Sequence, residues 1–116
     1  MKRLFIEAEG FRKRIDGLKE PSLLQIVQNE ILRDPNQGRV IPGLGGLRKI
    51  RVHDPWRGKG KRGGFRVIYL DFPKREKTYL IWIYGKNEAE DISPREKKII
   101  QQLVDFLKKE DKQNED

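Results

Sequence analysis

Residues 65–84, FRVIYLDFPKREKTYLIWIY, decide how the rest of the chain can be arranged. Two runs rich in β-branched and aromatic residues, 65–72 and 78–84, flank a polar segment that begins with Pro73. Such runs are typical of β-strands, and a proline followed by charged residues is typical of a turn. We therefore predict a β-hairpin at the centre of the fold, with its turn at residues 73–77.

A third strand is predicted before this hairpin, from residue 47 onward. Ile50 and Val52 alternate with Lys49 and Arg51, and side chains on a strand point alternately to its two faces. One face of this strand is therefore apolar and the other is cationic. The three strands are expected to form an antiparallel sheet.

The N-terminal part of the chain predicts a short strand at residues 2–7 followed by two helices. Apolar residues recur at helical intervals in two groups, Phe11, Ile15 and Leu18 in the first and Leu24, Val27 and Ile31 in the second. Pro21 suits the first turn of the second helix, and Asp34-Pro35 ends it. Residues 36–46 are rich in glycine and proline, which predicts an irregular connection to the sheet.

The sequence Ser93-Pro94-Arg95-Glu96 is a capping box of the S-x-x-E type with proline at the first helical position. It predicts a C-terminal amphipathic helix, with apolar residues at Ile99, Ile100, Leu103, Val104 and Leu107. The last residues, from 108 on, are charged or amide-bearing, and we expect about 109–116 to form a flexible, fraying tail.

These elements predict an α+β domain with the order β-α-α-β-β-β-α. The sheet should be small, twisted and mainly antiparallel, with the two N-terminal helices on one face and a further C-terminal helix. A chain of 116 residues has room for one domain, 1–116. The sequence has no apolar run of roughly 18 residues and no signal-peptide core, so we expect a cytoplasmic protein without a membrane partner.

The composition excludes several kinds of site. The chain has no cysteine and a single histidine, His53, which rules out thiolate sites and histidine cages, and we expect no metal and no cofactor. His53 lies beside Asp54-Pro55 at a strand end, where a surface or turn role is favoured over a catalytic one. The glycine-rich segments do not fit G-x-x-x-x-G-K-[ST], so a P-loop is not predicted.

Positive charge is the strongest functional signal. The formal net charge is +8, which favours a polyanionic partner, first nucleic acid and then a membrane surface. Eight basic residues and one acid, Asp54, fall within residues 48–66; the basic ones are Arg48, Lys49, Arg51, Arg57, Lys59, Lys61, Arg62 and Arg66. A solvated loop that improves solubility would have the same composition, but strands would fix Lys49, Arg51 and Arg66 on one face.

Fixed cations of this kind can support RNA cleavage without a metal. The 2′-hydroxyl of RNA can attack the adjacent phosphate, and nearby cations stabilise the added negative charge of the transition state. A lysine could act as the base, and a tyrosine or arginine could stabilise or protonate the leaving oxygen. Trp56 is a candidate for stacking on a base or for covering the loop, whereas Trp82 in a central strand is expected to fill core.

Three segments resemble the RelE/ParE toxin superfamily, namely 46–52 (GLRKIRV), 63–69 (GGFRVIY) and 83–88 (IYGKNE). The inserted loop GKGKRGG at 58–64 is similar to that of the HigB-like branch. The order of the predicted elements also resembles the RelE-like fold, so the resemblance covers nearly the whole chain. It implies the toxin of a type II toxin-antitoxin system that cuts mRNA in the ribosomal A site and inhibits translation.

The resemblance also implies roles for single residues. Lys49 and Arg51 match the family's paired basic residues, Arg66 matches its phosphate-binding arginine, and Lys86 lies near a further basic position. Asn87 departs from the arginine of RelE, and Ile92 or Ser93 stands where RelE has a late tyrosine. Tyr84 or Tyr69 is expected to replace that tyrosine, and we include Tyr84 among the catalytic candidates. RNA or ribosome contacts are expected from Arg48, Arg57, Lys59, Lys61, Arg62 and Trp56.

The implied partners are the 70S ribosome with its mRNA and a cognate antitoxin, expected to be HigA-like with a helix-turn-helix. Operator DNA would be bound only as part of the antitoxin complex. Two other functions stay open at this point. One is a ParE-like inhibitor of DNA gyrase, which the cationic residues at the nuclease positions argue against, and the other is an RNA-binding protein without catalysis.

Overall fold

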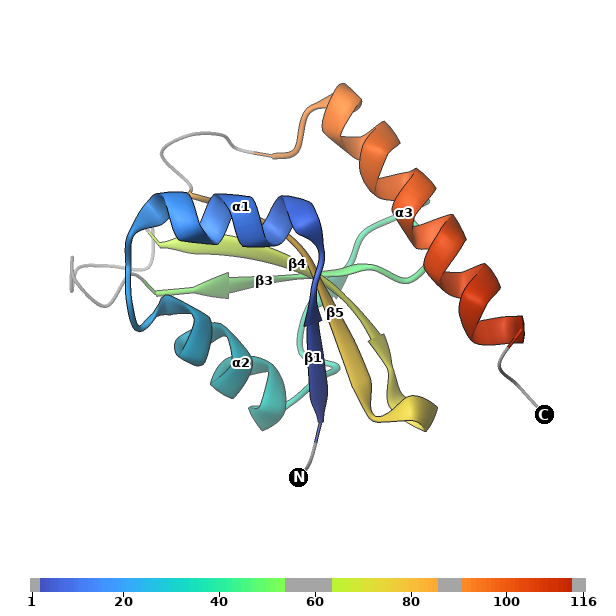
Figure 1. Cartoon of the computed structure of the whole chain (residues 1–116), viewed down its shortest axis with the longest axis horizontal. Coiled ribbons are helices and arrows are strands. Elements are labelled where there is room, and N and C mark those ends of the chain that lie inside the picture. Colours follow the sequence, from blue (N-terminus) through green and yellow to red (C-terminus); the bar gives the residue numbers. More distant parts are fainter. Residues whose placement is uncertain (1–2, 54–63, 86–90, 114–116) are drawn as a thin grey trace.

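A computed structural model of the chain describes residues 3–53, 64–85 and 91–113. Figure 1 shows a central sheet with helices on both sides of it. In chain order the elements are β1 (Leu4–Glu7), α1 (Glu9–Leu18), α2 (Leu23–Arg33), β2 (Arg39–Val40), β3 (Arg48–Val52), β4 (Phe65–Phe72), the 3-10 turn η1 (Pro73–Arg75), β5 (Lys77–Gly85) and α3 (Pro94–Gln113).

The sheet has the strand order β1-β5-β4-β3-β2. The predicted hairpin is confirmed as β4 and β5, which pair antiparallel and are joined through η1 and Glu76, a residue in the left-handed conformation. The third predicted strand is confirmed as β3, antiparallel to β4. β1 pairs with β5 in the parallel direction, so the sheet is mixed and mainly antiparallel, as predicted.

Helices α1 and α2 cover one face of the sheet, and α3 covers the other (Figure 1). The first core layer joins the two N-terminal helices to Ile50, Val52, Val67, Tyr69 and Leu80 of the sheet. The second layer joins Ile100, Val104 and Leu107 of α3 to the opposite face. The predicted arrangement of two helices on one face and the C-terminal helix elsewhere is therefore confirmed. Two residues of the predicted apolar stripes differ: Ile99 of α3 is exposed by 53%, and in α2 Leu23 is fully buried where Leu24 was predicted.

Two local features differ from the sequence prediction. The connection 36–46 contains a two-residue strand, β2, which pairs antiparallel with β3 at the edge of the sheet; a pair this short leaves no periodicity in the sequence. Helix α2 begins at Leu23, so Pro21 lies in the turn before the helix and not in its first turn.

Helix α3 begins at the predicted capping box. The backbone N–H of Ser93 donates to Glu96 Oε1 over 2.8 Å, and the N–H of Glu96 donates to Ser93 Oγ over 3.1 Å. The helix continues to Gln113, so residues 109–113, which were predicted to belong to a fraying tail, are helical. Arg75 of η1 holds this end, because its guanidinium pairs with the carboxylate of Asp111 at 3.0 Å.

The connection after α2 is tied to the sheet by two side chains of the central strands. The Tyr69 hydroxyl donates to the Pro35 carbonyl and accepts from the N–H of Gly38. Arg48 donates to the carbonyls of Asn36 and Gly38. Gly38 itself has no room for a side chain, since an added Cβ would lie 2.9 Å from Arg48 Cβ and from the Tyr69 hydroxyl. These contacts fix the start of β2 against β3 and β4.

We predict that Tyr69→Phe lowers the free energy of unfolding by about 1–3 kcal/mol, because the buried N–H of Gly38 loses its acceptor. Urea denaturation at neutral pH measures this change. Tyr79→Phe serves as the control, because it removes a hydroxyl from a half-buried ring and should change the stability by about 0.5 kcal/mol or less. Equal losses for the two variants would contradict the role given to the Tyr69 hydroxyl.

Candidate active site

Strand register brings four polar side chains together on the central strands. Arg51 of β3 lies directly opposite Arg66 of β4, and Arg66 lies directly opposite Tyr84 of β5. Residues opposite each other in a sheet share a face, with their Cβ atoms about 4.5–5.5 Å apart. Lys49, two residues before Arg51, points to the same face. We call Lys49, Arg51, Arg66 and Tyr84 the basic patch.

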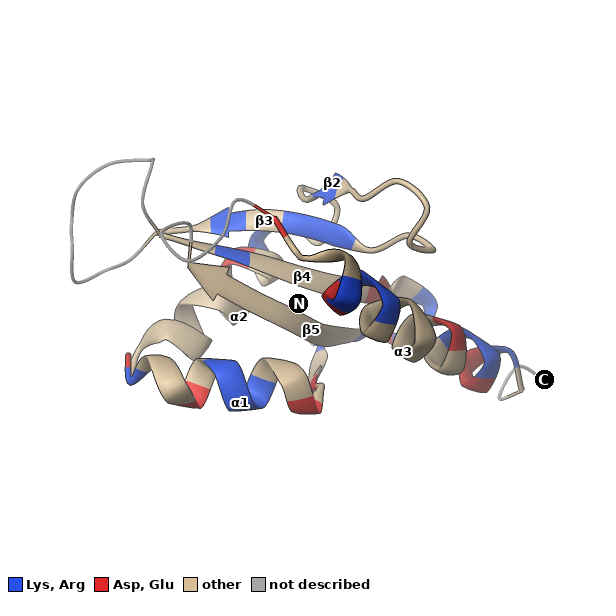
Figure 2. Cartoon of the chain, turned by 90° about the horizontal axis from the view of Figure 1, so that it is seen from above, with Lys and Arg blue, Asp and Glu red and all other residues tan. Residues whose placement is uncertain are grey.

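The basic patch lies on the face that α3 covers. Ile68 is the register partner of Lys49 and belongs to the core layer under α3, as does Tyr84. Figure 2 shows the basic residues of β3 and β4 as bands on neighbouring strands, with the N-terminal end of α3 close to them. The prediction that Lys49, Arg51 and Arg66 share one face is confirmed by this register.

Arg66 is the most buried charged residue of the patch. The residue is exposed by only 9%, and its Nη1 atom is buried without a hydrogen-bond partner among the residues that the structure describes. Burial lowers the pKa of the Arg66 guanidinium below its ordinary value, the charge of Arg51 lowers it further, and Tyr84 acts in the opposite direction. A guanidinium N–H left without an acceptor costs free energy in the folded state, and an anion bound there would remove that cost.

Tyr84 carries the second unpartnered polar atom. It is exposed by 2%, and its hydroxyl oxygen is buried with no hydrogen-bond partner in the described ranges 3–53, 64–85 and 91–113. Burial raises the pKa of the Tyr84 phenol, Asp91 and Glu96 raise it further, and Arg66 lowers it. The phenol therefore keeps its proton at neutral pH and can act as a donor. Since Arg66 is its register partner, one phosphate group could accept hydrogen bonds from both side chains.

An acidic residue lies beside the patch at the start of α3. The Asp91 carboxylate is 3.7 Å from the Lys49 ammonium. The same carboxylate oxygen accepts a hydrogen bond of 2.8 Å from the N–H of Ile92, whose side chain is buried under the sheet face. Sequence analysis did not single out Asp91, because its closeness to Lys49 follows only from the tertiary fold.

Arg14 of α1 is a second residue that sequence analysis missed. Its Nε atom donates to the carbonyl of Ile83, which precedes Tyr84 in β5, and its guanidinium lies 5.1 Å from the centre of the Trp82 ring. β1 pairs with β5 only as far as Leu80, so Arg14 contacts β5 beyond that pairing. Trp82 is half-buried and packs against the α3 layer, as expected of a core residue.

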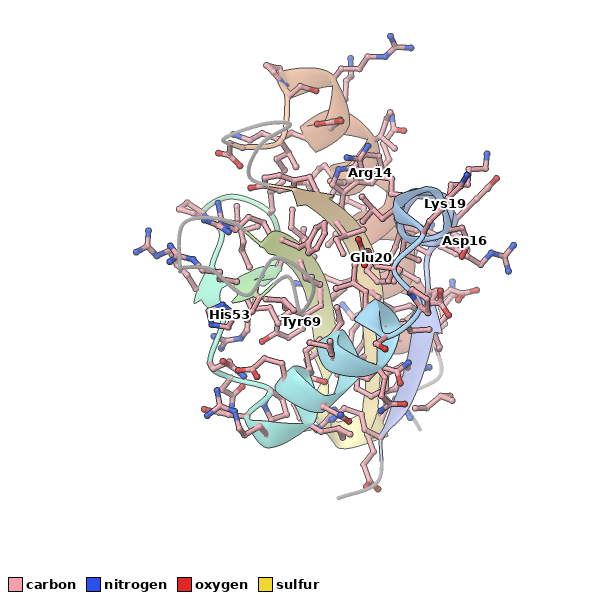
Figure 3. All side chains as sticks on the ribbon, turned by 90° about the vertical axis from the view of Figure 1, so that its left-hand side faces the viewer. Arg14, Asp16, Lys19, Glu20, His53 and Tyr69 are labelled. Atoms are coloured by element: carbon pink, nitrogen blue, oxygen red, sulfur yellow. The ribbon has the colours of Figure 1, made fainter. Side chains whose placement is uncertain are left out.

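Three other candidates lie outside the basic patch. Arg48 follows the opposite alternation to Lys49 and donates to the carbonyls of Asn36 and Gly38. Tyr69 belongs to the core layer of α1 and α2, so of the two candidate tyrosines only Tyr84 faces the patch. His53 is exposed at the end of β3. Figure 3 shows His53 at the margin of the molecule and Tyr69 further inside it.

The remaining candidates from the sequence fall outside the residues that the structure describes; they are Trp56, Arg57, Lys59, Lys61, Arg62 and Lys86. Within residues 3–53, 64–85 and 91–113, no group of three or more histidine or acidic side chains is placed to hold a metal ion. No helix in these same ranges is long and apolar enough to cross a bilayer.

Comparison with known proteins identifies the fold and the family of the chain. A solved chain from the crystal structure of the intact E. coli RelBE toxin-antitoxin complex has the same fold, with a TM-score of 0.53 and 16% sequence identity over 71% of this chain and 94% of that chain. The family model described as the RelE toxin of the RelE / RelB toxin-antitoxin system matches residues 11–115. Because that match covers most of the sequence, the chain belongs to the RelE toxin family.

Proposed function

We propose that this toxin is a metal-independent endoribonuclease that cuts mRNA in the ribosomal A site and thereby inhibits translation. The observation that carries the proposal is the pair of buried, unpartnered polar atoms, Arg66 Nη1 and Tyr84 Oη, on neighbouring strands beside Lys49 and Arg51. Native proteins rarely leave such atoms unpaired. A phosphodiester of single-stranded RNA has the charge and the acceptor oxygens that both atoms need.

In the proposed reaction the 2′-oxygen attacks the adjacent phosphorus atom, and the bond from phosphorus to the 5′-oxygen breaks. The products are a 2′,3′-cyclic phosphate and a 5′-hydroxyl end. Arg51 and Arg66 stabilise the charge that gathers on the non-bridging oxygens. The 2′-hydroxyl gives its proton to water while the Lys49 ammonium stabilises the oxyanion that forms, and the Tyr84 phenol donates its proton to the leaving 5′-oxygen.

Tyr84 favours this reading over the two alternatives. A protein that only binds RNA needs cations and stacking surfaces, and it gains nothing from a buried phenol that stays protonated. A ParE-like gyrase inhibitor has no need of a phosphate-binding group at all. The raised pKa of Tyr84 and its place opposite Arg66 instead suit a proton donor beside a phosphate.

The proposed partners are a cognate antitoxin, HigA-like with a helix-turn-helix, and the ribosome with its mRNA in the cytoplasm. The fold match is to a toxin-antitoxin complex, which supports an antitoxin partner. The glycine-rich insertion at 58–64 supports the HigB-like branch. We propose that Arg57, Lys59, Lys61, Arg62 and Trp56 contact RNA or ribosome, and that Lys86 adds a further cation to the catalytic group. Operator DNA would be reached only through the antitoxin.

Arg66→Gln should reduce cleavage by about 10²-fold or more and abolish growth arrest, because a fixed charge-stabilising donor is lost. Primer extension on mRNA under translation measures the cuts, and antitoxin binding should persist. Arg12→Gln is the matched control, since it removes the same charge from an exposed position on α1 and should leave cleavage unchanged. If the unaltered toxin made no new 5′ ends and instead trapped gyrase on DNA, the nuclease proposal would be wrong.

Tyr84→Phe should lower the cleavage rate by about 10²–10⁴-fold, the range of general acid catalysis. Its free energy of unfolding at pH 7 should be unchanged or higher, because the change removes a buried hydroxyl that has no partner. Cleavage assays and urea denaturation on the same preparation test both parts. A variant that loses stability together with activity would indicate a structural role for the hydroxyl.

The raised pKa of Tyr84 also predicts an effect of alkaline pH. The folded chain holds the phenol proton more tightly than the unfolded chain, whose tyrosines ionise near pH 10. This contribution to stability is complete at neutral pH and is lost as the pH rises above about 10. Tyr84→Phe should therefore lose less stability between pH 9 and pH 11 than the unaltered protein, as measured by urea denaturation; an identical decline would contradict the shift.

A further inference from the structure

The ion pair between Asp91 and Lys49 places an anion where a ligand phosphate would bind. Lys49 is exposed by 28% and Asp91 by 57%, and the two charged groups are 3.7 Å apart. Exposed pairs of this kind contribute little free energy, because water competes for both partners. The contact therefore holds Lys49 in the free chain and can be broken by a stronger anion.

The backbone that follows Asp91 is nevertheless held in place. Its carboxylate accepts the N–H of Ile92, and Ile92 is exposed by only 5%. The capping box of Ser93 and Glu96 then anchors the start of α3, and it engages the Glu96 carboxylate with the N–H of Ser93. Asp91 is thus held near the basic patch with an exposed carboxylate that pairs with Lys49 and can turn away from it.

We propose that Asp91 is a specificity-determining residue of the basic patch, because its carboxylate occupies Lys49 until a phosphodiester chain displaces it. The inference rests on the proposed function, since it takes the patch to be the site of RNA binding. A ligand with a single carboxylate gains no binding free energy at Lys49, because it only replaces the carboxylate of Asp91 with its own. A phosphodiester chain gains Lys49 in addition to Arg51 and Arg66, so Asp91 selects for it over ligands that carry a single weak negative charge.

Binding of a fluorescent single-stranded 2′-O-methyl oligoribonucleotide, which cannot be cleaved, tests this selection over a series of salt concentrations. Asp91→Asn should bind about two- to fivefold more tightly, the range that corresponds to an exposed ion pair. Its plot of log K against log salt should keep the slope of the unaltered protein, because Lys49 contacts a phosphate in both complexes.

Asp105→Asn is the matched control. It removes the same charge from α3, where Asp105 is exposed and accepts a hydrogen bond from Gln101, about 17 Å further along the helix than Pro94. Its affinity should change by less than that of Asp91→Asn, and its salt slope should stay unchanged. In a Lys49→Gln background the effect of Asp91→Asn should disappear.

The outcomes separate the two proposals. If Arg66→Gln weakens binding but Asp91→Asn and Asp105→Asn have the same affinity for the oligonucleotide, the patch binds RNA and the role proposed for Asp91 is wrong. The same follows if the gain from Asp91→Asn survives the loss of Lys49. If Arg66→Gln binds the oligonucleotide as well as the unaltered protein does, the proposed RNA site itself is wrong, and the inference about Asp91 is overturned with it.

Discussion

The pairing register of β3, β4 and β5 is the constraint on which the site depends. Because side chains alternate along a strand, a slip of one residue in any of the three strands would move its member of the basic patch to the other face. Arg51, Arg66 and Tyr84 are direct partners in this register. The apolar residues of the same strands enforce it, since Val52, Val67 and Ile83 must reach the layer of α1 and α2.

A bulge between Ile68 and Tyr69 allows β5 to serve two layers. After the bulge in β5, Trp82 and Tyr84 face the side of α3. Before it, Leu80 is the partner of Tyr69 and is buried under the N-terminal helices. An extra residue in one strand changes the phase of the alternation at the cost of one ladder position. Both the core residue Leu80 and the site residue Tyr84 thus obtain the surroundings they need within a single strand.

The sequence was sufficient for features with local causes. The hairpin, the alternation of Lys49 and Arg51 with Ile50, and the capping box at Ser93 depend on neighbours in the chain, and the structure confirms each of them. The same alternation places Arg48 on the face of Ile50, opposite to Lys49 and Arg51. Its side chain donates to a backbone carbonyl there, away from the basic patch for which an RNA contact was predicted. Its grouping with the other cations came from composition alone.

Features that depend on pairing between distant parts of the chain could not be predicted from the sequence in the same way. Alternation along 65–72 already puts Tyr69 on the face opposite Arg66, but placing Tyr84 beside Arg66 required the register across β4 and β5. The bulge has no signature in the composition of either strand. Asp91 precedes a capping box, where an acid is ordinary because it favours the positive end of a helix dipole. Only the packing of α3 across the sheet shows that the same carboxylate reaches Lys49.

Asp91 both precedes the start of α3 and lies against Lys49, so the packing of this helix affects which anions the patch can bind. Arg51 and Arg66 are register partners of like charge, and like charges placed opposite each other destabilise a sheet. The Asp91 carboxylate pairs with the third cation of the patch, Lys49, and the burial of Ile92 holds it there. The same negative charge opposes any anion that approaches Lys49. A phosphate chain therefore has to replace this contact with stronger ones, and Lys49 is not open to every anion.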